Sequence, residues 1–263
     1  MTARLLPLVA FLPILIVLAI PSPARAQTPQ QNLAKLCDEF WQGYLEANPT
    51  RATSLGDKRY DDRLDDITPR GISAERKRLK EVLARAMAID EKTLSAQDRL
   101  TRSALVTEVE DHLAYISCGL YEWTVDPLGG PQVEFMDFAE YTTIDTPEDA
   151  ARYVKRVMAM GPYIDDHIAN LRTGKAEKKV AVRAAVQKTL DQLMRINATE
   201  IESLGVWKPA AAPHQSWSAA ERERFAKNLG KAIESSLLPA LERYRAFLDK
   251  EILPVSRPPE RAG

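Results

Sequence analysis

The sequence predicts an all-α protein, and three observations support that prediction. Glycine is scarce, at 11 of 263 residues, while alanine, leucine and the long charged residues that favour helices are frequent. Apolar residues recur three and four positions apart in successive segments, which is typical of amphipathic helices. Ser or Thr followed three residues later by an acid precedes several of these segments and is a helix-start signal.

The first helix is expected over 33–47 and the second over 73–92. Apolar residues of the first share one face, and Pro49 ends it because the residue before a proline avoids helical geometry. Trp41 and Tyr44 are expected to pack in the core. A polar loop over 56–71 follows, and Ser73 is the expected N-cap of the second helix.

A third helix should begin after Ser95, with Asp98 three positions on, and end near Gly119. Its inward-facing residues are expected to be Leu100, Ala104, Leu105, Val109, Leu113 and Ile116. Residues 120–143 are irregular and rich in glycine, proline and aromatic residues. The composition of 120–143 predicts a structured loop between helices.

Helix signals continue through the second half. Thr146 followed by proline and two acids predicts a helix to about residue 160, with a kink or break at Gly161-Pro162 and a second helix to 171. Another amphipathic helix is expected over 180–201, then a connector over 208–216. A capping box at Ser218 should open a long final helix, which Pro239 should kink.

The first 26 residues have the features of a cleaved export signal. A short basic start precedes an apolar run over 5–20, and small residues at Ala24 and Ala26 place the cleavage site before Gln27. The apolar run is short for a bilayer span, so an uncleaved anchor is the less favoured alternative. We therefore expect a periplasmic or secreted protein with no membrane contact after cleavage.

Charge excludes one class of partner. The chain has 36 basic and 37 acidic residues, and the leader contributes bases but no acids. Nucleic-acid binding needs a clear basic excess, which this balance does not supply.

Two cysteines, Cys37 and Cys118, fall on different predicted helices. In an oxidising compartment they could form a disulfide that closes a long loop. The alternative is a pair of free thiols that behave as small apolar residues. The spacing of the cysteines leaves both alternatives open.

The titratable residues offer weak metal candidates. Glu108 and His112 are four apart on one helix face, a spacing that could give two ligands, although a solvated pair is the commoner meaning. His167 follows two aspartates that could hold it protonated, but a water-exposed helix face is the favoured expectation. His214 has no evident partner. No metal, cofactor or catalytic residue is assigned to this chain.

The irregular region supplies two candidate cleft-lining residues, Trp123 and Tyr141. Glycine-rich aromatic segments between helices often contact ligands. Packing of Trp123 against the helical core is the favoured alternative.

Several segments together resemble a known bacterial family. They are 40–64, with its Asn-Pro-Thr-Arg-Ala-Thr turn and Gly-Asp-Lys-Arg-Tyr-Asp-Asp-Arg loop, then 123–131, 146–174 and the proline-rich end at 253–263. On these segments the chain resembles the N-terminal half of the domain of unknown function 885 family. Members of that family look like zinc peptidases of the gluzincin type, which implies the helical part of a neurolysin-like architecture.

The resemblance also implies what this chain lacks. Family members carry a His-Glu pair followed by Pro-Gly-His far downstream, whereas no His-Glu dipeptide occurs here. The expected organisation is a leader over 1–26, a helical domain over 27–253 and a linker over 254–263 that leads toward a missing catalytic half. This chain would then be an inactive substrate-cleft or lid half, with peptides as partners and zinc held elsewhere. The alternative is a non-catalytic periplasmic binding or scaffold module.

Overall fold

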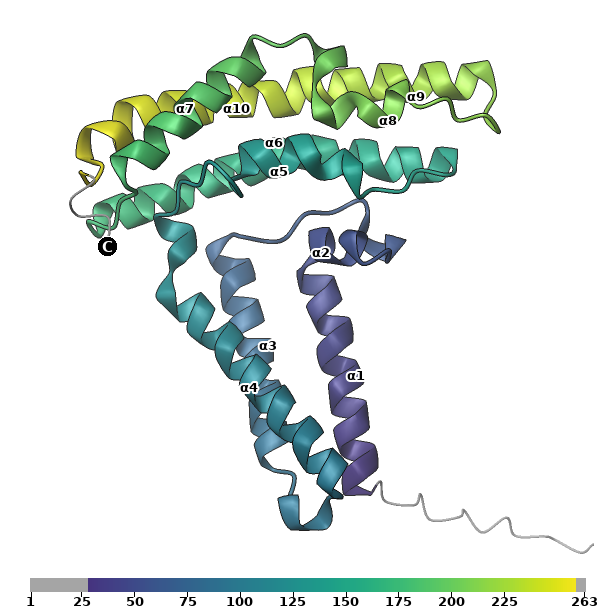
Figure 1. Cartoon of the computed structure of the whole chain (residues 1–263), viewed down its shortest axis with the longest axis vertical. Helices are drawn as coiled ribbons and strands as arrows, with labels where there is room; N and C mark the ends of the chain where they lie inside the picture. Colours follow the sequence, from purple (N-terminus) through teal and green to yellow (C-terminus); the bar gives the residue numbers. More distant parts are fainter. Residues whose placement is uncertain (1–27, 259–263) are drawn as a thin grey trace, which may run out of the picture.

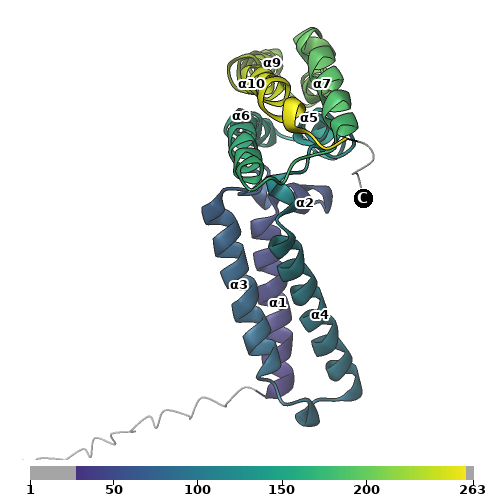
Figure 2. The same cartoon turned by 90° about the vertical axis from the view of Figure 1, so that its left-hand side faces the viewer.

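The computed structural model describes residues 28–258, which are mainly helical and contain no strand. Figures 1 and 2 show two parts: an upright stalk and, across its upper end, a head of longer helices. Each part has its own cluster of buried apolar residues. The all-α prediction is confirmed. The predicted leader lies outside the described residues.

The stalk consists of α1 (Pro29–Ala47), α3 (Pro69–Met87) and α4 (Ala96–Cys118). Its core is formed by Leu33, Leu36, Leu79, Val82, Ala86, Leu94, Leu105 and Val109. The predicted cap at Ser95 is confirmed, since its hydroxyl accepts from the amide of Asp98 at 3.1 Å. The predicted cap at Ser73 is wrong: α3 starts four residues earlier because Thr68 caps it and Pro69 occupies its first position.

Three residues assigned to the stalk core, Ala104 among them, lie at its surface instead. Leu100 is 64% exposed and Trp41 is 44% exposed. The three-helix stalk buries only a narrow stripe of each helix. Apolar residues flanking that stripe therefore remain in solvent.

Two short helices, α2 (Pro49–Ser54) and α5 (Pro131–Asp137), occupy segments that the sequence marks as irregular. Each begins with proline, which fits the first helical turn because its missing amide hydrogen is not needed there. α2 lies where the stalk meets the head, whereas α5 lies within the head (Figures 1 and 2).

The longest helix of the head is α6 (Pro147–Ala176), and its predicted start is confirmed by a capping box between Thr146 and Asp149. Of the predicted kink or break at Gly161-Pro162, the break is wrong, because α6 continues through Pro162. Proline removes the amide that would bond the carbonyl of Met158, and the Ser236 hydroxyl donates to that carbonyl instead at 2.7 Å. A Cβ on Gly161 would lie 2.3 Å from Ser236 Oγ, so glycine permits the close crossing.

The remaining helices of the head are α7 (Arg183–Asn197), α8 (Lys208–Ala211), α9 (Ala219–Ala232) and α10 (Leu238–Phe247). Helices α9 and α10 pack on α6, while α7 packs on α10 and α8 on α9. The capping box at Ser218 is confirmed. Two π-helical turns, Ile233–Leu237 and Leu248–Ile252, interrupt the final helix, the first of them directly before Leu238 and Pro239. A π turn is a known way to accommodate a local defect in helical bonding.

The end of the described chain is attached to the head. Arg257 forms an isolated bridge with Val182, and its Nε donates to the carbonyl of Val180 at 2.8 Å. Residues 254–258, predicted as linker, are therefore bonded to the segment before α7. No helix within residues 28–258 is long and apolar enough to cross a membrane.

Candidate functional site

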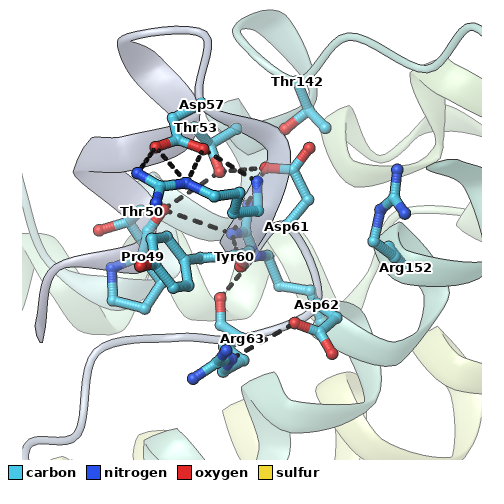
Figure 3. A network of polar contacts seen from close by, with 12 residues as sticks. Pro49, Thr50, Thr53, Asp57, Tyr60, Asp61, Asp62, Arg63, Thr142 and Arg152 are labelled. Carbon is cyan, nitrogen blue, oxygen red and sulfur yellow. Dashed lines mark hydrogen bonds and ion pairs between the residues drawn. The ribbon is translucent and has the colours of Figure 1, made fainter. Parts of the chain in front are cut away.

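The loop over residues 49–63, which carries the most distinctive sequence, wraps around one buried cation, Arg156 of α6. Its side chain has 0% exposure. Its Nε donates to the carbonyl of Arg63 at 2.7 Å, and its Nη2 donates to the carbonyls of Tyr60 at 2.6 Å and Pro49 at 3.4 Å. Figure 3 shows the residues of this loop gathered about those bonds.

A buried carboxylate completes the arrangement. Asp61 accepts from the Thr53 hydroxyl at 2.5 Å and lies 3.8 Å from Arg156 Nη2. The ring of Phe138 lies 4.4 Å from the Arg156 guanidinium carbon, close enough for a cation–π contact. The loop therefore presents three carbonyls and one carboxylate to a single guanidinium.

Burial is costly for Arg156 and lowers its pKa to about 10, against the raising effects of Asp61 and Asp65. The group stays charged at neutral pH, because that value still lies well above 7. Its Nη1 has no hydrogen-bond partner among the described residues. Arg156 therefore anchors the loop to the head, and the distinctive loop sequence has a structural role.

Ion pairs around the loop strengthen this attachment. Lys155, next to Arg156, donates to Asp62 at 2.5 Å, and Lys58 bonds both Asp145 and Asp149. Burial alone would raise the pKa of Asp149. Hydrogen bonds from Lys58 and from the amides of Asp145 and Thr146 outweigh burial and lower it to about 2. Asp149 is thus ionised at all ordinary pH values.

A second group of polar residues lies beside this loop and has no such partners. We call Asp65, Glu134, Tyr141 and Tyr163 the acidic end. Burial raises the pKa of Glu134, and the nearby carboxylates of Asp65 and Asp126 raise it further. Burial likewise raises the pKa of Tyr141 to about 12, with a further contribution from Glu134.

The bonding of the acidic end is incomplete. Asp65 accepts from Thr50, at 3.0 Å from its hydroxyl and 3.2 Å from its amide, and from no other side chain in the described part of the chain. Burial raises the pKa of Asp65 despite those bonds. Within residues 28–258, Glu134 has no ion pair, and neither Tyr141 nor Tyr163 donates a hydrogen bond through its hydroxyl. Glu134 therefore has no cation paired with it among residues 28–258, and the cation that acts on Asp65 is the buried Arg156.

The stalk contributes a run of aromatic residues that leads toward the acidic end. Trp41 stacks on Tyr44 at 5.6 Å, and Tyr44 stacks on His112 of α4 at 5.6 Å. Tyr115, one turn further along α4, is 64% exposed and close enough to Tyr163 to raise its pKa. We call Trp41, Tyr44, His112 and Tyr115 the aromatic strip.

The structure separates the two predicted cleft-lining residues. Trp123 lies near the C-terminal end of α6, because the carbonyl of Glu122 abuts Gly174, and the Arg257 guanidinium lies 5.2 Å from its ring. Tyr141 packs edge-on against Phe138 at 5.0 Å, next to Tyr153 in the first part of α6. These ends of α6 are about 30 Å apart at the helical rise, so Trp123 and Tyr141 do not share one site.

Both cysteines are free. Cys37 is half-buried in the stalk and Cys118 is exposed as the last residue of α4. The stacking of Tyr44 on His112 sets the level of the two parallel helices, which puts the cysteines roughly 15 Å or more apart along the stalk. A disulfide needs Cα atoms within about 7 Å. Of the two alternatives, the structure shows free thiols.

The histidines do not assemble a metal site among the described residues. His112 Nε2 lies 3.2 Å from Glu108, but no group of three or more His, Cys, Asp or Glu side chains that could hold a metal occurs in 28–258. The expectation of a water-exposed His167 is wrong: burial lowers its pKa to about 4, and its ring contacts Tyr244. His214 stacks on Trp217 at 4.0 Å. None of the three histidines therefore belongs to a candidate metal site within residues 28–258.

Two surface grooves lie apart from these residues. One of about 380 Å³ lies between α6 and α10, where Arg243 pairs with Asp165 and Arg172 pairs with Glu251. The other, of about 430 Å³, lies on α3 beside Arg76, Lys77 and Lys80. The charged residues of the first groove are paired, whereas in the second the Arg76 Nε is buried and has no hydrogen-bond partner among the described residues.

Comparison with known proteins gives a family and a fold. The model of the family described as "Bacterial protein of unknown function (DUF885)" matches residues 49–263. Among solved structures, the chain is similar to one titled "putative lipoprotein" from Colwellia psychrerythraea, with a TM-score of 0.76 and 12% identity over 88% of this chain. The match covers 43% of the Colwellia chain, so the present chain spans less than half of that structure. No curated protein matches.

Proposed function

Because this chain belongs to the DUF885 family of bacterial proteins of unknown function, we propose that it is the peptide-holding part of an exported zinc-peptidase-like hydrolase. The observation that carries the proposal is the surface formed by the aromatic strip and the acidic end. Aromatic side chains supply apolar contact area at low entropic cost, and the carboxylates supply a charge to recognise.

The residues present indicate which part of the proposed enzyme would bind the peptide and which would bind zinc. The described residues hold no metal-ligand set, so any zinc of the proposed enzyme would be bound by residues outside 28–258. The similarity to a structure of more than twice this length supports the idea that such a portion exists in relatives. This chain would then bind and orient the peptide, and zinc would supply Lewis-acid chemistry from the other part.

Export is part of the same proposal. The leader-like residues 1–26 and the similarity to a protein titled "putative lipoprotein" both support a location outside the cytoplasm. Cleavage before Gln27 would release the protein from the membrane.

The test is to recover the native protein from the cell envelope fraction and measure its mass and its hydrolysis of mixed short peptides. We expect hydrolysis that a chelator abolishes and zinc restores, in a product heavier than this 29.4 kDa chain. The 263-residue chain alone should bind peptides without cleaving them. The absence of both binding and hydrolysis in every form of the protein would refute the proposal. Binding without hydrolysis by the native product would favour the non-catalytic binding module.

A further inference from the structure

We propose that the groove on α3 binds the phosphate group of a phosphate monoester. The groove has a volume of about 430 Å³ and is lined by side chains of one helix: Ser73, Arg76, Lys77, Lys80, Glu81 and Ala84. None of these residues belongs to the aromatic strip or the acidic end, so the inference does not rest on the proposed function.

The groove lies on the outer side of α3. Leu79, Val82 and Ala86 of this helix are buried in the stalk core, whereas Lys77 and Lys80 are exposed. Helix α3 forms one edge of the stalk (Figure 2), so a ligand can enter the groove directly from solvent.

Arg76 gives the first reason for an anionic ligand. Its Nε is buried and has no hydrogen-bond partner among the described residues, and its guanidinium forms no ion pair with any of them. A buried donor without an acceptor costs free energy. Because a guanidinium carries donors and no acceptor, an oxygen anion is the ligand that would satisfy it.

The charge of α3 gives the second reason. The helix has six bases and two acids, namely Arg70, Arg76, Lys77, Arg78, Lys80 and Arg85 against Glu75 and Glu81. Glu75 accepts two hydrogen bonds of 2.7 Å from Arg78, and Glu81 lies 3.9 Å from Lys77. Within residues 28–258, Arg76 and Lys80 therefore face the groove without an acid of their own.

The arrangement of these donors favours phosphate over carboxylate. Arg76, Lys77 and Lys80 lie within about 6 Å of one another along the helix axis, and the Ser73 hydroxyl lies one turn before them. One guanidinium can satisfy a planar carboxylate, whereas the oxygens of a phosphate point in several directions and accept from several side chains. The groove has the size of a small-molecule site, which indicates an organic group attached to the phosphate.

A phosphate monoester can be a soluble molecule or the headgroup of phosphatidic acid, and the test distinguishes the two. The probes for the 263-residue chain are phenyl phosphate, benzoate, and phosphatidylcholine vesicles with or without phosphatidic acid. Calorimetry measures binding of the small probes, and co-sedimentation measures binding to the vesicles. We expect phenyl phosphate to bind at least about tenfold more tightly than benzoate, because it accepts more charge-assisted hydrogen bonds.

Three variants locate the site. Arg76→Gln and Lys80→Gln should each weaken binding of phenyl phosphate at least about tenfold. Lys188→Gln is the matched control, because it removes the same charge from an exposed lysine of α7 outside the groove. Since Arg76 has no hydrogen bond to lose, Arg76→Gln should unfold at the same urea concentration as the native chain. Phenyl phosphate should raise the unfolding midpoint of the native chain and not that of Arg76→Gln.

The outcomes either assign the ligand or overturn the site. Binding of phenyl phosphate that depends on Arg76 and not on Lys188 would support a soluble ester. Binding only to vesicles that contain phosphatidic acid, with the same dependence on Arg76, would assign the phosphate to a lipid headgroup. Binding of no probe, equal binding of benzoate and phenyl phosphate, or equal losses in Arg76→Gln and Lys188→Gln would overturn the proposal.

Discussion

Replacing Arg156 with methionine should destabilise the protein more than any neighbouring surface change. The substitution removes the bonds to the carbonyls of Pro49, Tyr60 and Arg63 and leaves Asp61 buried opposite an apolar side chain. Removing one member of a buried charged pair typically costs about 3–5 kcal/mol. Part of that cost should be recovered in the double variant with Asp61→Asn, because the uncompensated charge is then gone.

The matched control is Lys155→Met, one residue earlier on α6. Lys155 pairs with Asp62 of the same loop, but its side chain is 69% exposed. Exposed pairs contribute at most about 1 kcal/mol, so this variant should lose little. Urea unfolding followed by circular dichroism measures both. A loss below about 1 kcal/mol for Arg156→Met, or equal losses for both variants, would refute the anchoring role.

Three further outcomes are expected. The pKa of Asp149 in the folded protein is about 2, below its ordinary value of 3.8. Its contribution of about 2 kcal/mol to the free energy of unfolding is therefore present above pH 4 and is lost as the pH falls toward 2. Asp149→Asn should flatten that part of an acid-unfolding curve, and an unchanged curve would contradict the assignment. Ser236→Ala should lower the free energy of unfolding by about 1 kcal/mol in the native background. The loss should be smaller in a Pro162→Ala background, because alanine restores an amide that can bond the carbonyl of Met158. Equal losses in the two backgrounds would show that the Ser236 hydroxyl does not compensate for the proline. Thiol titration of the folded protein should label Cys118 quickly and Cys37 slowly, because burial and the adjacent acid raise the pKa of Cys37, and recovery of an intramolecular disulfide would contradict the structure.

Helix positions were the most predictable feature because their signals are local. Thr146, Ser95 and Ser218 cap helices where the sequence places those caps, since a cap depends on residues only three positions apart. The continuity of α6 could not be predicted from its own sequence. It depends on Ser236, which is distant along the chain and supplies the bond that Pro162 removes.

The candidate site was largely unpredictable for the same reason. Asp65, Glu134 and Tyr163 come from three segments, and only the meeting of stalk and head brings them together. Tyr141 was predicted to line a site, but Trp123 was paired with it through closeness in sequence. One signal for Arg156 was available: it falls between Tyr153 and Val157, inside the apolar stripe of α6, where a charge must find buried partners.

The most direct test of the account is photo-crosslinking of a peptide that carries a free N-terminus and a benzophenone at its second residue, followed by mapping of the modified residues by mass spectrometry. The account predicts adducts at the junction of strip and acidic end, on Tyr115, Tyr141 or Tyr163, and their loss in Glu134→Gln. Adducts confined to the outer helices α7 and α9, unaffected by that substitution, would contradict a peptide-binding surface between the stalk and the head.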